Sequence, residues 1–227
     1  MRQFQCQLII WYQIHLALGE LTQVWYLEIK SKNFCIVLSS PSGAGKTSIS
    51  KKILLKDKSI SLSISCTTRP RRVGEKNKKD YIFIDDSIFE KRKKAKDFLE
   101  SAKVFGYYYG TLKKSVEDFF KKKKDVLFDI DWQGYQQLKQ SGQEVVGIFI
   151  LPPSKKELIQ RLEKRGRDTK LEMKKRMNLV QDEISHFPEY DYVVINKDIN
   201  LCVNQIQNIV NAERLKKSKL NNLTKFV

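Results

Sequence analysis

The chain has few of the residues from which many catalytic and metal sites are built. Only two histidines occur among its 227 residues, His15 and His186. A histidine-based metal centre or a Ser-His-Asp hydrolytic triad is therefore hard to assemble. The four cysteines are scattered, without a CxxC spacing, and most lie in apolar segments, where cysteine behaves as a small hydrophobe. This pattern argues against a disulfide framework or a zinc site and predicts a reducing, cytoplasmic location.

The sequence also has no apolar run long enough for a membrane helix. The stretch Leu8–Leu18 is too short and is interrupted by Gln13 and His15. Residues 1–32 are apolar and aromatic without a clean period, and they match a secretion signal poorly. We interpret them as an N-terminal extension without an assigned role, and we expect no membrane partner.

Positive charge is the feature in excess. Lys and Arg number 43 against 26 Asp and Glu, which gives a net charge of +17. Such a balance permits binding to nucleic acid. Runs such as Lys121–Lys124 are, however, typical of solvated helix surfaces. Nucleic-acid binding is thus an alternative that charge alone suggests, and we expect none.

The most informative stretch is Asn33–Ser48, NFCIVLSSPSGAGKTS. An apolar strand runs into a glycine turn, and a helical pattern follows. This is the setting of a phosphate-binding loop (P-loop), in which backbone N–H groups and a helix N-terminus surround phosphate oxygens. In the full pattern G-x-x-x-x-G-K-[ST], Ser40 takes the first glycine position, which is tolerable unless φ there is positive. The predicted ATP-binding residues are Ser40, Pro41, Ser42, Gly43, Ala44, Gly45, Lys46, Thr47 and Ser48.

Apolar strands and helical patterns alternate on both sides of a middle region. We expect helices over 48–56 and 115–123, buried strands at Val126–Phe128 and Val145–Leu151, and a last strand at Tyr192–Ile195. This order predicts an α/β fold with a parallel sheet and helices on both faces. The region between about 60 and 112 has short alternating strands and resembles an insert, with Gly106–Thr111 interpreted as a turn. The tail 216–227 is polar.

Two aspartates follow the buried strand at Val126–Phe128. Asp129 and Asp131 have the same facing in a strand, and parallel sheets bind ligands at their carboxyl edge. Asp129 is predicted to bind Mg²⁺ together with the Thr47 hydroxyl. The alternative is that these aspartates only cap the next turn.

Arginine and tyrosine side chains indicate a second phosphate site. Guanidinium forks and phenol hydroxyls at Arg69, Arg72, Tyr81 and Tyr109 suit a second phosphate group. Further arginines lie around residues 161–176. On a helical segment that closed over a triphosphate they would stabilise the transferred phosphoryl group, whereas the alternative is that they are solvated on a helix surface. Two phosphate sites without a strong base favour transfer between nucleotides, because a nucleoside monophosphate, with a second phosphate pKa of about 6, needs no general base.

Several segments together resemble guanylate kinase. They are SSPSGAGKTS (39–48), SCTTRPRRVGE (65–75), KDYIF (79–83), FLESAKVFGYYYGT (98–111), DIDWQG (129–134), ILPPS (150–154), RLEKRGRDT (161–169) and YDYVVIN (190–196). They follow the family's order over about residues 34–215. Tyr107 departs from the asparagine usual before the paired tyrosines, and residues 1–32 have no counterpart.

The resemblance implies a Mg²⁺-dependent transfer of a phosphoryl group from ATP to GMP. It implies a P-loop core at 33–64 and 112–215, a helical lid at about 155–185 and a GMP-binding insert at 65–111. Ser65, Arg69, Arg72, Tyr81 and Tyr109 would hold the GMP phosphate, while Glu100, Thr111 and Asp131 would read guanine. The remaining implied residues serve ATP, the metal or the transition state: Lys46, Thr47, Asp129, Arg161, Arg165, Arg176 and, near adenine, Asn196.

Two alternatives within this resemblance stay open. Guanylate-kinase-like domains also occur as non-catalytic protein-binding modules, which typically degrade the P-loop. Another nucleoside monophosphate kinase would use a different acceptor base. The sequence says nothing about the oligomeric state.

Overall fold

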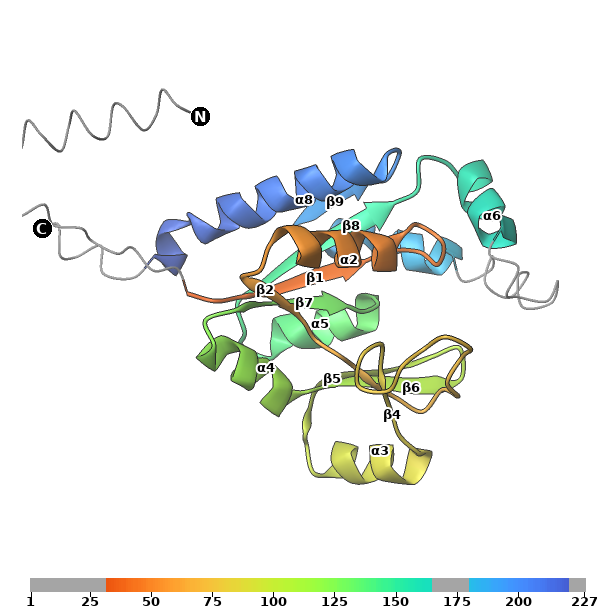
Figure 1. Ribbon diagram of the computed structural model, residues 1–227, viewed down its shortest axis with the longest axis vertical. Coiled ribbons are helices and arrows are strands. Elements are labelled where there is room, and N and C mark those ends of the chain that lie inside the picture. Colours follow the sequence, from red (N-terminus) through yellow and green to blue (C-terminus); the bar gives the residue numbers. More distant parts are fainter. Residues whose placement is uncertain (1–31, 165–179, 221–227) are drawn as a thin grey trace, which may run out of the picture. The chain divides into compact units, whose positions relative to one another are not determined.

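Five short apolar segments form a parallel sheet at the centre of the fold (Figure 1). The computed structural model describes residues 32–164 and 180–220. The strand order of this core sheet is β2-β7-β1-β8-β9, and every neighbouring pair is parallel. The strands are β1 (Cys35–Ser39), β2 (Ile60–Leu62), β7 (Asp125–Asp129), β8 (Val145–Leu151) and β9 (Tyr192–Ile195).

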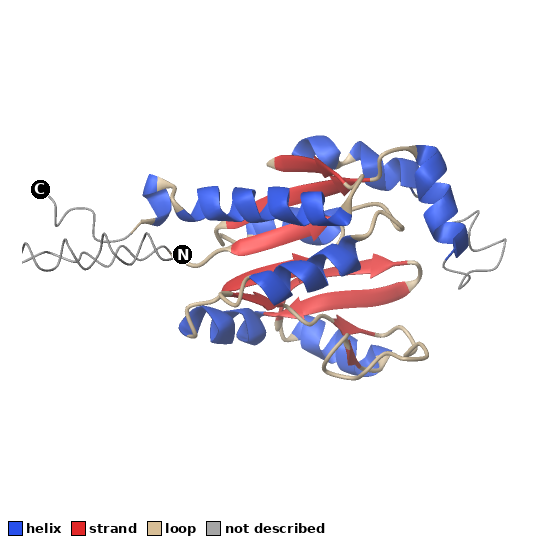
Figure 2. Ribbon diagram, turned by 45° about the horizontal axis from the view of Figure 1, so that its top comes forward, coloured by secondary structure: helices blue, strands red, loops and turns tan. Residues whose placement is uncertain are grey.

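The central strand β1 is buried on both faces because its alternate side chains enter two different hydrophobic clusters. Phe34, Ile36 and Leu38 pack with α2 (Lys46–Lys56) and α8 (Ile199–Arg214). Cys35 and Val37 pack with α4 (Lys113–Lys121) and α5 (Trp132–Gln140) on the other face. Figure 2 shows the helices on both faces of the strands. The predicted α/β class, with a covered parallel sheet behind a P-loop, is confirmed.

A second, smaller sheet follows the order β4-β3-β6-β5. Its strands are β3 (Cys66–Thr67), β4 (Ile82–Phe83), β5 (Phe98–Val104) and β6 (Tyr107–Leu112), with α3 (Asp86–Lys94) packed on it through Phe89. Its β3–β6 and β5–β6 pairs are antiparallel, and its β3–β4 pair is parallel.

The interpretation of Gly106–Thr111 as a turn is wrong. These residues, apart from Gly106, form most of β6, which pairs with β5 from Val104↔Tyr107 to Phe98↔Leu112. The turn is confined to Phe105 and Gly106, whose φ angles are 50° and 85°. Two residues with positive φ make a tight hairpin turn that matches the strand twist, so the aromatic residues after it are free to extend as a strand. Tyr107 lies at the hairpin end and is partly exposed.

Helix α6 (Lys155–Lys164) follows β8 and begins where the sequence predicts. The Ser154 hydroxyl accepts a hydrogen bond from the Glu157 N–H at 3.1 Å, which caps the helix. Leu158 and Leu162 pack against Val180 and Ile184 of the helical residues 180–185. The middle of the expected lid, 165–179, lies outside the described residues, as do 1–31 of the N-terminal extension and 221–227 of the tail.

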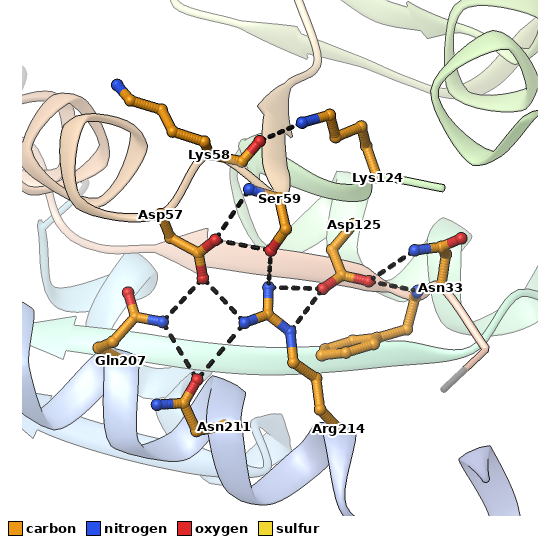
Figure 3. Close-up of polar contacts among 10 residues, drawn as sticks. Asn33, Asp57, Lys58, Ser59, Lys124, Asp125, Gln207, Asn211 and Arg214 are labelled. Atoms are coloured by element: carbon orange, nitrogen blue, oxygen red, sulfur yellow. Dashed lines mark hydrogen bonds and ion pairs between the residues drawn. The ribbon is translucent and has the colours of Figure 1, made fainter. Parts of the chain in front are cut away.

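Arg214, in the last turn of α8, joins several elements at the amino end of the core sheet (Figure 3). Its guanidinium contacts Asp57 after α2 at 2.8 Å and Asp125 at the start of β7 at 2.8 Å. It also donates to the Ser59 hydroxyl at 2.7 Å. Burial opposes ionisation of Asp57, but hydrogen bonds from Ser59, Arg214 and Gln207 outweigh it and hold the Asp57 pKa well below its usual value.

A second ion pair lies at the same end of the sheet. Lys219 is only 2% exposed, and its ammonium contacts Glu213 at 2.7 Å. Burial disfavours the Glu213 carboxylate, yet hydrogen bonds from Lys216, Lys219 and Tyr192 lower its pKa to about 2. The Lys32 N–H donates to the Lys219 carbonyl at 2.6 Å. The segment that enters β1 and the segment that follows α8 are therefore in direct contact.

No helix within residues 32–164 and 180–220 is long and apolar enough to cross a membrane.

Candidate active site

A cleft of about 230 Å³ lies at the carboxyl ends of β1 and β7 and is closed on its other side by the second sheet. This position follows from the fold, because loops at the carboxyl edge of a parallel sheet gather around one crevice. A second hollow beside α2 shares part of this wall. The cleft is lined by Ser40, Pro41, Ser42, Gly43, Gly45, Lys46, Thr47, Ser65, Arg72, Tyr81, Glu100, Ala102, Val104, Phe105, Tyr109, Asp129, Ile130, Asp131 and Glu183.

The loop between β1 and α2 has the backbone that phosphate binding requires. Gly43 and Gly45 have φ angles of 96° and 101°, which are open to glycine and strained for other residues. Ser40 is not among the positive-φ positions of the described chain, so its side chain costs no backbone strain. Gly45 is the N-cap of α2. The loop therefore presents its N–H groups at the positive end of a helix.

Lys46, Thr47 and Asp129 form a charged group at the end of this loop. The Lys46 ammonium lies 2.8 Å from Asp129 Oδ1 and donates to the Ile130 carbonyl at 2.9 Å. The Thr47 hydroxyl donates to Asp129 Oδ2 at 3.4 Å. The described residues contain no cluster of three or more His, Cys, Asp or Glu able to hold a metal. One hydroxyl and one carboxylate suit Mg²⁺, which takes few protein ligands and completes its shell with phosphate oxygens and water.

Glu100 is a buried carboxylate with an unsatisfied oxygen. It lies on β5, is 3% exposed and lines the cleft, and its Oε1 has no hydrogen-bond partner among the described residues. Its strand partner is Thr111. Burial raises the pKa of Glu100 to about 7, and the nearby Asp131 carboxylate adds to this shift while Thr111 offsets part of it. Leaving such an oxygen unpaired is costly, so the site suits a ligand that donates hydrogen bonds.

Asp131 has a structural role as well as a place in the cleft. As the N-cap of α5, it accepts a hydrogen bond from the Gly134 N–H at 3.0 Å. Its other oxygen accepts from Gln133 Nε2 at 3.2 Å. Asp131 therefore caps the element that follows it. Capping does not remove it from the cleft, and it fixes the carboxylate near Glu100.

The arginine and tyrosine group lies between the cleft and the second hollow. Arg69 is 7% exposed and lines the second hollow, and its guanidinium contacts Glu75 Oε1 at 2.7 Å. It also lies 5.4 Å from the Tyr81 ring centroid. The Tyr81 and Tyr109 rings meet edge to face at 5.9 Å. Arg72 lines both hollows, so two guanidinium groups and two phenols line the second hollow together.

Asn196 and Arg161 lie behind the phosphate-binding loop. The Asn196 side chain is 5% exposed, and its amide donates to the Ala44 carbonyl at 2.7 Å. Arg161 donates to the Asn196 backbone carbonyl at 3.1 Å and to Glu157 at 3.0 Å. Neither Asn196 nor Arg161 lines the cleft formed by the described residues.

Most of the predicted site residues meet at this cleft, although they come from both sheets and several loops. Arg69 and Ser48 line only the adjoining hollow, and Thr111 is fully buried beside Glu100. Ala44 is buried beneath its loop. The predicted catalytic residues Arg165 and Arg176 lie outside the described residues.

Three polar residues near the cleft were not predicted. Glu75 holds Arg69, and it also accepts from the Arg72 N–H at 2.8 Å. Glu183 lines the cleft, and its Oε2 accepts from the Ser42 N–H at 3.0 Å. Gln137 contacts the backbone of β5. The segment 65–75 includes Glu75, so its charge beside three arginines was a usable signal. Glu183 and Gln137 carry no such signal.

Comparisons with known proteins agree on one family. A family model described as guanylate kinase matches residues 32–213. The guanylate kinase of Novosphingobium aromaticivorans is 48% identical over 197 residues, which cover 86% of this chain and 89% of that protein. The guanylate kinase of Rickettsia prowazekii is 47% identical over 190 residues, covering 84% of this chain and 96% of that protein. The crystal structure of guanylate kinase from Anaplasma phagocytophilum superposes with a TM-score of 0.72 at 36% identity, covering 87% of this chain and 94% of that one.

Proposed function

This chain belongs to the guanylate kinase family, and from that premise we propose that its cleft transfers the γ-phosphoryl group of ATP to GMP, giving ADP and GDP. The observation that carries the choice of acceptor is the buried Glu100 carboxylate, whose Oε1 is unpaired among the described residues. Guanine offers two adjacent donors, N1–H and the 2-amino group, which one carboxylate can accept together. Adenine offers no such pair and would leave the carboxylate buried and unsatisfied.

The donor half of the reaction is assigned to the loop Ser40–Ser48. Its N–H groups and Lys46 would hold the ATP phosphates, and Thr47 and Asp129 would hold Mg²⁺, which neutralises phosphate charge when bound. Arg161, with Arg165 and Arg176 outside the described residues, is proposed to stabilise charge on the transferred group. The side chain of Asn196 supports the loop at Ala44.

The acceptor half is assigned to the second sheet and its surroundings, within residues 65–111. Ser65, Arg69, Arg72, Tyr81 and Tyr109 are proposed to hold the GMP phosphate. Glu100, Thr111 and Asp131 are proposed to hold guanine. The segment at about 155–185 is proposed as the lid that excludes water from the transfer.

The chemical step needs positioning rather than a base. A GMP phosphate oxygen attacks the γ-phosphorus while the bond from that phosphorus to the bridging oxygen breaks, and ADP keeps the electron pair. The attacking phosphate is already largely dianionic near neutrality, because its second pKa is about 6. No proton has to be removed, which fits a cleft lined by no histidine among the described residues. We also propose that the protein works in the cytoplasm, as the scattered cysteines led us to expect.

A coupled assay of ADP formation with Mg·ATP and each of GMP, AMP, CMP and UMP tests the proposal. We expect turnover with GMP and little with the other three acceptors. Equal turnover on AMP would overturn the guanine assignment. Absence of turnover on all four would favour a non-catalytic binding module. Lys46→Ala should lose activity while remaining folded by circular dichroism, which separates loss of chemistry from loss of structure.

A further inference from the structure

We propose that Gln137 is a positioning residue for the acceptor base: its side-chain amide holds the backbone of β5 so that Glu100 stays opposite Asp131 in the cleft. This inference rests on the proposed function, because Glu100 matters here as the group that reads guanine. Gln137 does not line the cleft within the described residues, so its effect would be exerted through β5.

The Gln137 side chain pairs with the backbone of β5 on the side where β5 has no neighbouring described strand. Among the described strands, β5 is an edge of the second sheet, with β6 on one side and no strand on the other. Gln137 Oε1 accepts from the Ser101 N–H at 3.0 Å, and Gln137 Nε2 donates to the Ser101 carbonyl at 2.8 Å. A primary amide carries a donor and an acceptor and can pair with both groups of one residue. These bonds tie the edge strand to helix α5 of the core at the residue after Glu100.

Three positions on α5 meet the same short piece of β5. Asp131 caps the helix and lies close enough to Glu100 to raise the pKa of that carboxyl. At Gly134, a Cβ would lie 2.8 Å from Glu100 Oε2, so a larger residue there would force the carboxylate to move. Gln137 follows three residues later and holds Ser101. Positions three apart share one face of a helix, which makes this face a support for Glu100.

The hydrogen bonds from Gln137 would oppose electrostatic repulsion between Glu100 and Asp131. The Glu100 and Asp131 carboxylates repel each other when both are ionised. Asp131 is held by the N-terminus of α5, so the repulsion would act to displace Glu100 and its strand β5 from the helix. The two hydrogen bonds between Gln137 and the Ser101 backbone resist this displacement directly. Their loss should therefore loosen Glu100 while the donor loop, on the other side of the cleft, is unaffected.

Two substitutions at Gln137 and one matched control test the proposal in the full chain. Gln137→Met removes both hydrogen bonds to Ser101 at similar volume, and Gln137→Glu keeps the acceptor for the Ser101 N–H but places a charged oxygen against the Ser101 carbonyl. Gln136→Met is the control, because the neighbouring Gln136 amide donates instead to Glu189, at 2.8 Å. We expect Gln137→Met to raise the KM for GMP about tenfold, with the KM for ATP within about twofold. Gln137→Glu should raise the KM for GMP at least as much, because its charged oxygen repels the Ser101 carbonyl, and Gln136→Met should leave both KM values unchanged.

Amide hydrogen exchange at Ser101 supplies a readout that does not depend on activity. The Ser101 amide should exchange at least about tenfold faster in Gln137→Met than in the unsubstituted chain, with exchange at Val37 in the core sheet unchanged. Discrimination of GMP over AMP should also fall, which a loss of general stability would not produce.

Three results would overturn the inference. They are a KM for GMP within about twofold of the unsubstituted chain, equal rises in the KM values for GMP and ATP, or unchanged Ser101 exchange. If Gln137→Met does not fold, the KM values and the Ser101 exchange of Gln137→Glu test the inference instead. If the unsubstituted chain does not phosphorylate GMP, the proposed function fails, whereas Ser101 exchange still decides whether Gln137 holds β5.

Discussion

At the scale of single residues, ionised Glu100 should lower the stability of the free protein but favour the binding of guanine. The carboxylate is buried, one oxygen is unpaired among the described residues, and another carboxylate lies nearby. Each feature disfavours its ionised form in the free protein. The ionised form is nevertheless the one that accepts two hydrogen bonds from guanine. Affinity for the acceptor and stability should therefore respond to pH in opposite directions.

The KM for GMP should rise as pH falls through the pKa of Glu100. With that pKa at about 7, ionised Glu100 dominates at pH 8 and is about a tenth of the total at pH 6. We expect a KM for GMP about tenfold higher at pH 6 than at pH 8, measured at saturating ATP. The phosphate of GMP titrates near the same pH, so Glu100→Gln is the control. It should show only the weaker dependence that belongs to the phosphate. Identical pH profiles for both proteins would contradict the assignment.

The same residue should lower stability as pH rises. Its pKa is raised in the folded protein from 4.5 to about 7, so the folded state binds more protons than the unfolded state between these values. Stability therefore decreases across this window as pH increases. Glu100→Gln should be more stable than the unsubstituted chain at pH 8 by about 2–3 kcal/mol, with the difference disappearing near pH 4.5. Urea denaturation at both pH values measures this. A variant that is less stable at pH 8 would refute the argument.

At the scale of elements, the P-loop depends on a strand end far away in the sequence. Gly45 adopts a φ of 101°, and a Cβ there would lie 2.6 Å from Asn196 Nδ2. The Asn196 amide in turn donates to Ala44, the residue before. The end of β9 thus supports the loop from behind, and the close approach explains why glycine is needed at that position in addition to its backbone conformation.

Substitution of Asn196 should reveal which part of ATP it serves. If the Asn196 side chain only supports the loop, Asn196→Ala weakens all nucleoside triphosphate donors alike. We expect the KM for ATP to rise about five- to tenfold, since one buried hydrogen bond is lost, with an equal factor for GTP as donor. The KM for GMP should stay within about twofold. A loss confined to ATP would instead support the adenine contact that the family resemblance implies.

At the scale of the whole molecule, the chemistry and the main ion-pair network lie at opposite ends of the core sheet. The cleft is at the carboxyl ends of the strands, whereas Arg214 joins Asp57, Ser59 and Asp125 at the amino ends (Figure 3). This network ties the end of α8 to the end of α2 and the start of β7. Changes there should affect stability and leave the kinetic constants almost unchanged.

Arg214→Met tests this separation. Removal of the guanidinium leaves two largely buried carboxylates without their partner, and we expect a loss of about 3 kcal/mol in the free energy of unfolding at pH 7. Because the folded pKa of Asp57 lies below its ordinary value, its stabilising contribution is present above that ordinary value and is lost as pH falls. The gap between variant and unsubstituted chain should therefore narrow only below about pH 4.

Arg92→Met is the control for Arg214→Met. Arg92 pairs with Asp97 at 3.7 Å on an exposed surface, so its replacement should cost less than about 1 kcal/mol. A similar loss for both variants would show that the Arg214 network contributes no more than a surface pair. The KM values for both substrates, measured at 25 °C, should match the unsubstituted chain in both proteins.

The sequence predicted the helices and strands whose apolar residues recur with a regular spacing or form a continuous run. Apolar runs and the glycine turn located β1, the P-loop and most other strands and helices. Residues Ile60–Ser65 alternate between apolar and polar side chains, as in one strand of the region predicted to hold short alternating strands, but β2 ends at Leu62 and the chain crosses to the second sheet. Ser63 and Ser65 are buried in this crossing, so the pattern continues although the strand does not.

The contacts between side chains and distant backbone could not be predicted. Gln137 on Ser101 and Glu183 on Ser42 join residues separated by 36 and 141 positions. Such a hydrogen bond depends on how two elements lie in space. Neither partner belongs to a hydrophobic period or a charge pattern that would predict it. Motifs identified the predicted cleft residues one by one, and most of them lie together in space, whereas Gln137 and Glu183 belong to none of the segments that carry the family resemblance.

The hydrogen bond from Lys32 to the carbonyl of Lys219 has a practical consequence for rearranging the chain. The two segments meet at the amino edge of the core sheet, away from the cleft, so a short peptide linker from Leu220 to Lys32 would span little distance. New ends could then be opened at the exposed hairpin turn Phe105–Gly106. A circularly permuted protein built this way would keep every strand of the core sheet intact, and it would free the second sheet to be labelled or tethered at its tip.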